Sequence, residues 1–218
     1  MRYDYTTNGQ RCKILCLNCL EGKTIKFHLN ERNTSVNLAL TGLMAALVLV
    51  ATMFFKVQIP VGTDKTMIGF ANVFCILAGL LLGPVYGGLA AGIGSCIFDL
   101  IGGWADSAPS TLIFKFLMAF VCGLIAWGGD HTARKLSRVI VGAVSGSLCY
   151  CVLYLGYSFV KLILVGSAPE AAALAMVTKL AATLTNAIVA DVIAVPFFFA
   201  IRKALERAHL PVGGPRRA

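Results

Sequence analysis

The stretch Leu80–Gly103, LLLGPVYGGLAAGIGSCIFDLIGG, contains the features that decide the fold. Its apolar start is interrupted at Gly83-Pro84, a pair typical of turns, and it ends on two further glycines. Between these turns the only charged residue is Asp99. Small residues recur at four-residue spacing, which lets helices approach closely inside a membrane: Gly83, Gly87 and Ala91. The stretch therefore predicts two consecutive helices that pack tightly within a bilayer.

The composition of the whole chain agrees with a membrane setting. Of its residues, 58% are hydrophobic and 13% are charged, and the mean hydropathy is +0.80. This is more apolar surface than a water-soluble domain can cover. A helix needs about 20 apolar residues to cross ~30 Å of hydrocarbon, and most of the chain from Val36 to Ile201 is such material. We expect the lipid bilayer to be the solvent of this region, with little room for a separate soluble domain.

Six apolar segments follow one another, separated by turn signals or basic connections, and no 20- to 50-residue repeat is evident. We therefore expect an all-α fold, a six-helix transmembrane bundle over residues 36–202. A cytoplasmic N-terminal segment, residues 1–35, precedes the bundle, and a basic cytoplasmic tail, residues 203–218, follows it. The expected helices cover residues 36–55, 68–82, 86–101, 110–127, 139–165 and 171–201.

The distribution of Lys and Arg predicts the orientation of this bundle, because cytoplasmic connections contain the excess of positive charge. Six basic residues precede the first segment, three lie between the fourth and fifth, and five follow the sixth. The alternate connections contain only Lys56 and Lys65. Both termini are thus expected in the cytoplasm. The net charge of +9 does not indicate nucleic-acid binding, since the cations are split among short segments.

The N-terminal segment contains Cys12, Cys16 and Cys19, a CxxxCxxC spacing. This spacing matches the iron-sulfur loop of radical SAM enzymes, but those enzymes need a large soluble α/β barrel for which this chain has no room. Reduced cytosolic thiols, or a start codon placed too far upstream, are the alternative interpretations. The segment lacks the apolar centre of a cleavable signal peptide, so we expect the chain to enter the membrane through its first helix.

Five ionisable residues fall inside the expected spans, and each costs at least ~2.5 kcal/mol at the centre of a membrane helix. They are Asp99, Lys115, Lys161, Lys179 and Asp191. With the orientation above, all but Asp191 lie toward the outer face. The lysines could extend outward to water, or one could form a structural ion pair with Asp99. Convergence of four such groups from separate helices favours a polar pocket open to the outside.

Two helices present polar or aromatic stripes. In the fifth segment Tyr150, Tyr154, Tyr157 and Lys161 are spaced i, i+4, i+7 and i+11, on one helical face. Such a face can stack on a flat heterocycle, although ordinary interhelical packing is the alternative for any one tyrosine. In the sixth segment a second stripe has the spacing i, i+4 and i+7: Lys179, Thr183 and Asn186. Asp191 lies deeper and off this stripe, and we interpret it as a packing or partner-contact residue.

Several catalytic motifs are missing from the sequence. There is no GxxxxGK[ST] phosphate loop, so the chain is not expected to hydrolyse ATP itself. It has no HExxH or GxSxG, and its three histidines lie outside the expected spans, which argues against intramembrane zinc or serine hydrolases. We therefore expect neither enzymatic activity nor a bound metal or cofactor.

Three features together resemble a known family of membrane proteins. Asn72, the stretch Leu80–Gly103 and the following APSTLIFKFLMAF of Ala108–Phe120 are similar to the S components of energy-coupling factor (ECF) transporters, specifically the riboflavin-type group. The resemblance extends over the six-helix region, roughly residues 36–202. The first 35 residues do not fit it.

The resemblance implies a function and partners. An S component captures a water-soluble vitamin at the outer side of a prokaryotic plasma membrane, here under the loop Lys56–Met67. It associates with a transmembrane T subunit and two ATPases, and the small-residue face of Gly42 and Ala46 is expected to dock on the T subunit. The loaded S component is thought to topple within the bilayer and so deliver its substrate inward.

The identity of the vitamin stays open, because similar S components accept riboflavin, pyridoxine, thiamine precursors or pantothenate. The residues that we expect to contact it are Asn72, Asp99, Lys115, Tyr150, Tyr154, Tyr157, Lys161, Lys179, Thr183 and Asn186.

Two other functions compete with vitamin capture. A small intramembrane enzyme could use Asp99 and Asp191 as its carboxylates, but these lie at opposite depths and no paired acidic motif surrounds them. A stand-alone proton-coupled carrier could use Asp191 as its proton site. Uptake that survives deletion of the ATPase genes would select the carrier.

Overall fold

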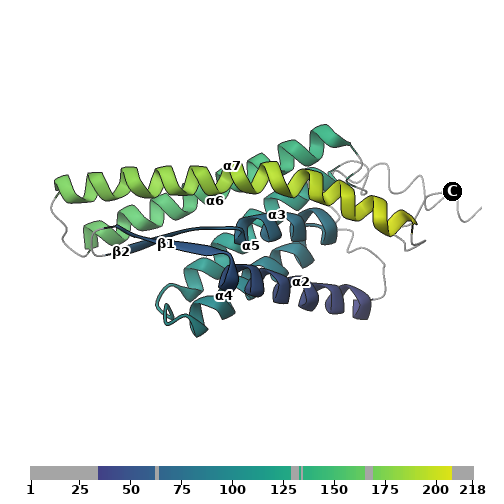
Figure 1. Ribbon diagram of the computed structural model, residues 1–218, viewed down its shortest axis with the longest axis horizontal. Coiled ribbons are helices and arrows are strands. Elements are labelled where there is room, and N and C mark those ends of the chain that lie inside the picture. Colours follow the sequence, from purple (N-terminus) through teal and green to yellow (C-terminus); the bar gives the residue numbers. More distant parts are fainter. Residues whose placement is uncertain (1–33, 62–63, 129–132, 134, 165–168, 208–218) are drawn as a thin grey trace, which may run out of the picture. The chain divides into compact units, whose positions relative to one another are not determined.

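The apolar runs form helices in the computed structural model, which describes residues 34–61, 64–128, 133, 135–164 and 169–207. Figure 1 shows these helices packed side by side, with one β-hairpin. The Cys12, Cys16 and Cys19 cluster and most of the basic tail lie outside the described residues. The elements are α2 (Thr34–Phe54), β1 (Lys56–Val61), β2 (Asp64–Gly69), α3 (Ala71–Leu82), α4 (Pro84–Ile101), α5 (Ala108–Trp127), α6 (Leu136–Leu164) and α7 (Pro169–Arg207).

Within the described residues, five helices are long and apolar enough to cross a membrane: α2, α4, α5, α6 and α7. Their outer faces expose large apolar side chains, among them Val152 (70% exposed) and Ile188 (63% exposed). Soluble proteins rarely expose continuous apolar surface of this kind, whereas a bilayer accommodates it. These helices therefore belong to a multi-pass membrane protein.

The second predicted helix is shorter than expected. The sequence suggested residues 68–82, but α3 has 12 residues and begins at Ala71, because Ile68 and Gly69 are part of strand β2. Twelve residues rise about 18 Å, too little to cross the hydrocarbon alone. Ile76, Leu77 and Ala78 are at most 1% exposed. The helix is thus enclosed in the protein, packed against α2, α4, α5 and α7.

Small residues allow α3, α4 and α5 to pack at backbone distance. A Cβ added at Gly87 would lie 2.5 Å from the carbonyl oxygen of Ala78, and one at Gly79 would collide with the carbonyl oxygen of Ala119. The chain passes from α3 to α4 through Gly83, whose φ of +83° is accessible chiefly to glycine. Pro84 then occupies the first turn of α4, where its missing N–H has no cost.

The described residues contain the six predicted helices, but a β-hairpin that the all-α prediction did not include follows α2. Strands β1 and β2 pair antiparallel, from Lys56 opposite Gly69 to Val61 opposite Asp64. The backbone N–H of Phe70 donates to the carbonyl of Phe55 at 3.1 Å and closes the base of the hairpin. The strands occupy the segment that the sequence suggested as a substrate-covering loop. Its alternating Val-Gln-Ile pattern is typical of a strand.

Candidate functional site

A cavity of about 150 Å³ lies at one end of the bundle. It is formed where the C-terminal ends of α4 and α6 meet the N-terminal end of α5, the base of the hairpin and the middle of α7. Nine of the ten residues predicted to contact a substrate line this cavity: Asn72, Asp99, Lys115, Tyr150, Tyr154, Tyr157, Lys161, Thr183 and Asn186. The structure thus brings together residues that are more than 100 positions apart in the sequence.

Lys179 is the exception. Its side chain is 1% exposed, and it is not among the described residues that line the cavity. It lies one turn before Thr183, whose hydroxyl donates to the Lys179 carbonyl at 2.6 Å. The shared face of α7 therefore continues past the cavity, and only Thr183 and Asn186 reach it.

A buried cation forms the floor of the site. Lys115 is 6% exposed, and its Nζ donates to Oδ1 of Asn72, which is 4% exposed. The same Nζ lies 4.1 Å from the centroid of the Tyr150 ring. A buried charge needs such compensation, and an amide oxygen and an aromatic face provide it from α3 and α6. This arrangement fixes the lysine against two neighbouring helices.

Asp99 is a second buried charged residue that lines the cavity. Its side chain is 3% exposed, accepts a hydrogen bond from the Thr111 hydroxyl and feels the positive charge of Lys115. The backbone N–H of Trp104 donates to the Asp99 carbonyl at 2.8 Å, which turns the α4–α5 connection back over the end of α4. Among the described lining residues Asp99 is therefore the one carboxylate, and its side-chain partners come from α5.

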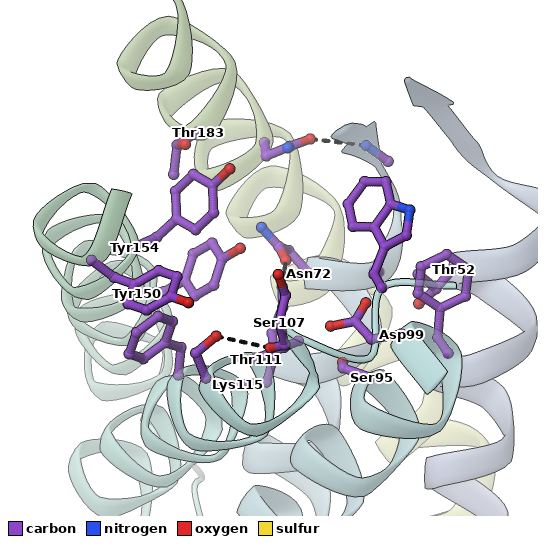
Figure 2. A pocket seen from close by; sticks show the side chains of 18 of the residues that line it. Thr52, Asn72, Ser95, Asp99, Ser107, Thr111, Lys115, Tyr150, Tyr154 and Thr183 are labelled. Carbon is purple, nitrogen blue, oxygen red and sulfur yellow. Dashed lines mark hydrogen bonds between the residues drawn. The ribbon is translucent and has the colours of Figure 1, made fainter. Parts of the chain in front are cut away.

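An aromatic wall faces these polar groups. The rings of Tyr150 and Tyr154 are stacked, with centroids 5.8 Å apart and planes 17° apart. Tyr157 packs edge-on against Phe114 at 5.6 Å. Figure 2 shows Tyr150 and Tyr154 on one side of the cavity, Asp99 and Thr52 on the other, and Asn72 between them. The three tyrosines of the predicted stripe thus all line the cavity from α6, and aromatic rings of this kind can stack on a flat ligand.

Two contacts define the rim. Asn186 of α7 accepts a hydrogen bond from the Gly69 backbone N–H at 3.0 Å, which ties the hairpin to α7. Lys161 of α6 forms an ion pair with Asp106 in the α4–α5 connection, with Nζ and Oδ2 3.7 Å apart. These contacts hold the hairpin and the connection beside the mouth of the cavity.

Sequence reasoning missed a polar face on α5 and its preceding turn. Ser107, Ser110, Thr111 and Phe114 line the cavity together with Lys115. Their spacing of i, i+3, i+4, i+7 and i+8 is the helical-face pattern that revealed the tyrosine stripe, and it could have found them. Other lining residues outside the predicted set are Thr52, Phe55, Gly69, Ala71, Ser95, Phe98, Trp104 and Ser158.

The residues assigned to other roles lie elsewhere. Asp191 is not among the described lining residues, and it accepts a hydrogen bond from the Ser147 hydroxyl at 2.8 Å between α7 and α6. Gly42 and Ala46 are both exposed on α2, and a Cβ added at Gly42 would meet nothing within 4 Å. The described part of the chain contains no group of three His, Cys, Asp or Glu residues placed to hold a metal ion.

Comparison with known proteins identifies the fold and the family of this chain. An uncharacterized protein encoded in the gap 3'region of Pyrococcus woesei is 31% identical over 119 residues, which are 55% of this chain and 74% of the relative. A solved structure described as the S component of a bacterial ECF transporter matches with a TM-score of 0.54 at 21% identity, over 80% of this chain and 98% of that one, which shows a shared fold. The model of the family "ECF-type riboflavin transporter, S component" matches residues 32–203, and the chain therefore belongs to this family of membrane proteins.

Proposed function

We propose that this chain captures a water-soluble vitamin, in the first place riboflavin, from outside the cell for ATP-driven import. The observation that supports this most is the cavity itself, which combines the stacked rings of Tyr150 and Tyr154 with the buried polar groups of Asn72, Asp99 and Lys115. A flat heterocycle with donors and acceptors on its edge finds a stacking surface and hydrogen-bond partners there.

The balance of charge narrows the substrate class. Among the described lining residues, Lys115 and Lys161 are cations and Asp99 is an anion, and Asp106 outside the lining pairs with Lys161. The four charges cancel, so an uncharged ligand adds no unpaired charge to the site. This favours vitamins without net charge, such as riboflavin and pyridoxine, over the anionic pantothenate. Of these two vitamins, the substrate in the family's name supports riboflavin.

The proposed energy source for import is ATP hydrolysis by partner subunits. The sequence has no phosphate loop, so ATP-driven uptake requires ATPases in other subunits, and we propose the T subunit and two ATPases of an ECF transporter for this role. In this proposal both termini are cytoplasmic, the cavity opens outward, and the membrane is the plasma membrane of a prokaryote. The exposed small residues Gly42 and Ala46 support α2 as the surface that docks on the T subunit.

Titration of the purified chain tests which vitamin it binds. Riboflavin fluorescence should be quenched saturably by the detergent-solubilised protein, with one site per chain, because a stacked aromatic wall contacts the ring. Calorimetry with pyridoxine, thiamine and pantothenate supplies the comparison. Lys115→Met is the matched variant, and it should raise the dissociation constant of riboflavin roughly 5-fold to 150-fold, as when a charged hydrogen-bond partner worth about 1 to 3 kcal/mol is lost. Absence of riboflavin binding, or tighter binding of pantothenate, would contradict the proposal.

A further inference from the structure

Two pairs of opposite charges lie around the cavity, one buried and one exposed to solvent. Lys115 and Asp99 are buried on the floor, 6% and 3% exposed. Lys161 and Asp106 lie at the rim, and their side chains are 39% and 72% exposed. Of these four groups only Asp106 is outside the lining among the described residues. The cation at the mouth is thus neutralised by a carboxylate that need not touch the ligand.

The α4–α5 connection holds Asp106 in place for this role. Gly103 has a φ of +81° and turns the chain sharply after α4. The Trp104 N–H then bonds to the Asp99 carbonyl at 2.8 Å, and the Ser107 N–H bonds to the Trp104 carbonyl at 2.9 Å. Asp106 therefore sits in a turn fixed at both ends, and its Oδ2 lies 3.7 Å from Lys161 Nζ.

From this geometry we propose that Asp106 is a specificity-determining residue: by pairing with Lys161 it makes the mouth of the cavity reject a phosphorylated vitamin in favour of the uncharged one. The inference rests on the proposed function. In this proposal the ring of the vitamin stacks on the tyrosines and its side chain extends toward Lys161, the exposed cation of the lining. A phosphate there carries about −1.5 to −2 charges at pH 7 and faces a carboxylate as well as the lysine.

Riboflavin and riboflavin 5'-phosphate are the probes that test this. They share the ring and differ in the phosphate, and both can be titrated by their own fluorescence against the full chain in detergent. The measured quantity is the ratio of the two dissociation constants. Asp106→Asn should shift this ratio about fivefold in favour of the phosphate, the size of effect that an exposed ion pair can produce. The shift should shrink in 1 M salt, where the screening length falls to about 3 Å.

Further variants separate charge from structure. Asp106→Glu keeps the carboxylate and should keep the wild-type ratio, whereas Lys161→Gln leaves the carboxylate alone and should disfavour the phosphate further. The double variant Asp106→Asn with Lys161→Gln should lose the gain, since the two groups act on each other.

Two results would overturn the inference while leaving the proposed function intact: an unchanged ratio in Asp106→Asn, or the same shift in the double variant. Failure of the wild-type chain to bind riboflavin would instead overturn the proposed function, and this inference with it.

Discussion

Tyr150 connects the polar floor of the cavity with its aromatic wall. Its ring faces Lys115 at 4.1 Å and stacks on Tyr154 at 5.8 Å. Cation–π contacts are worth roughly 0.5 to 2 kcal/mol and aromatic pairs about 0.5 to 1.5 kcal/mol. Because Lys115 is nearly inaccessible to water, loss of the ring would also leave the cation with one partner fewer. The residue is therefore expected to matter for binding more than for the fold alone.

Replacement of Tyr150 by Ala should raise the dissociation constant of riboflavin roughly 5-fold to 150-fold, about 1 to 3 kcal/mol, because both the stacking surface and the position of Lys115 are lost. Tyr150→Phe keeps the ring and should recover most of the affinity. Titration calorimetry on folded variants measures both.

Asp191→Asn is the control for this series, since Asp191 bonds Ser147 and is not among the described lining residues. A larger loss of affinity at Asp191 than at Tyr150 would show that the site lies on another face of the bundle.

The tyrosine stripe was predictable because helical periodicity alone decides which residues of α6 share a face. Periodicity does not decide where along that face a cavity ends. On α7 the same reasoning grouped Lys179 with Thr183 and Asn186, yet only the latter two line the cavity. How far the cavity extends along α7 depends on how α3 and the hairpin pack against this helix. One sequence does not reveal that packing.

At the scale of whole elements, the long helices were predictable and the hairpin was not. Continuous apolar runs mark α2, α4, α5, α6 and α7, whose ends lie within a few residues of expectation except at the C-terminus of α7. The hairpin between α2 and α3 has two six-residue strands, and the strand-like alternation Val57-Gln58-Ile59 is too brief to distinguish it from a loop. Its strands include Ile68 and Gly69, which in turn shortens α3.

The packing of α3 against α5 depends on one missing side chain. A Cβ at Gly79 would collide with the backbone carbonyl of Ala119, which cannot rotate away. Gly79→Ala should therefore lower the melting temperature of the solubilised protein, at a cost of about 1 to 3 kcal/mol for overpacking. The matched control is Gly42→Ala, where the added Cβ meets nothing within 4 Å. Equal thermal stability of the two variants would contradict the close approach of α3 and α5.

At the scale of the whole molecule, the proposed substrate cavity and the proposed docking face of α2 are different surfaces. The cavity lies between helices at one end of the bundle, whereas Gly42 and Ala46 lie on the exposed face of α2 and line no part of it among the described residues. Small residues permit close contact with a second transmembrane helix. Binding and assembly should therefore be separable by substitution, which a stand-alone carrier does not require.

Leu at both Gly42 and Ala46 should abolish co-purification with the T subunit and ATP-dependent riboflavin uptake, because two large side chains would hold the partner helix away. Riboflavin affinity should stay within about twofold, since neither position contacts the cavity. Gly156→Leu on α6 is the matched control: it too is exposed with nothing within 4 Å of an added Cβ, and it should leave assembly intact. Uptake is measured in proteoliposomes that contain the chain, the T subunit and the ATPases. A second measurement uses liposomes that contain the chain alone, with a proton gradient as the energy source. Uptake by the chain alone, driven by the gradient, would favour a proton-coupled carrier, whereas normal assembly of the Leu variant would reject α2 as the docking surface.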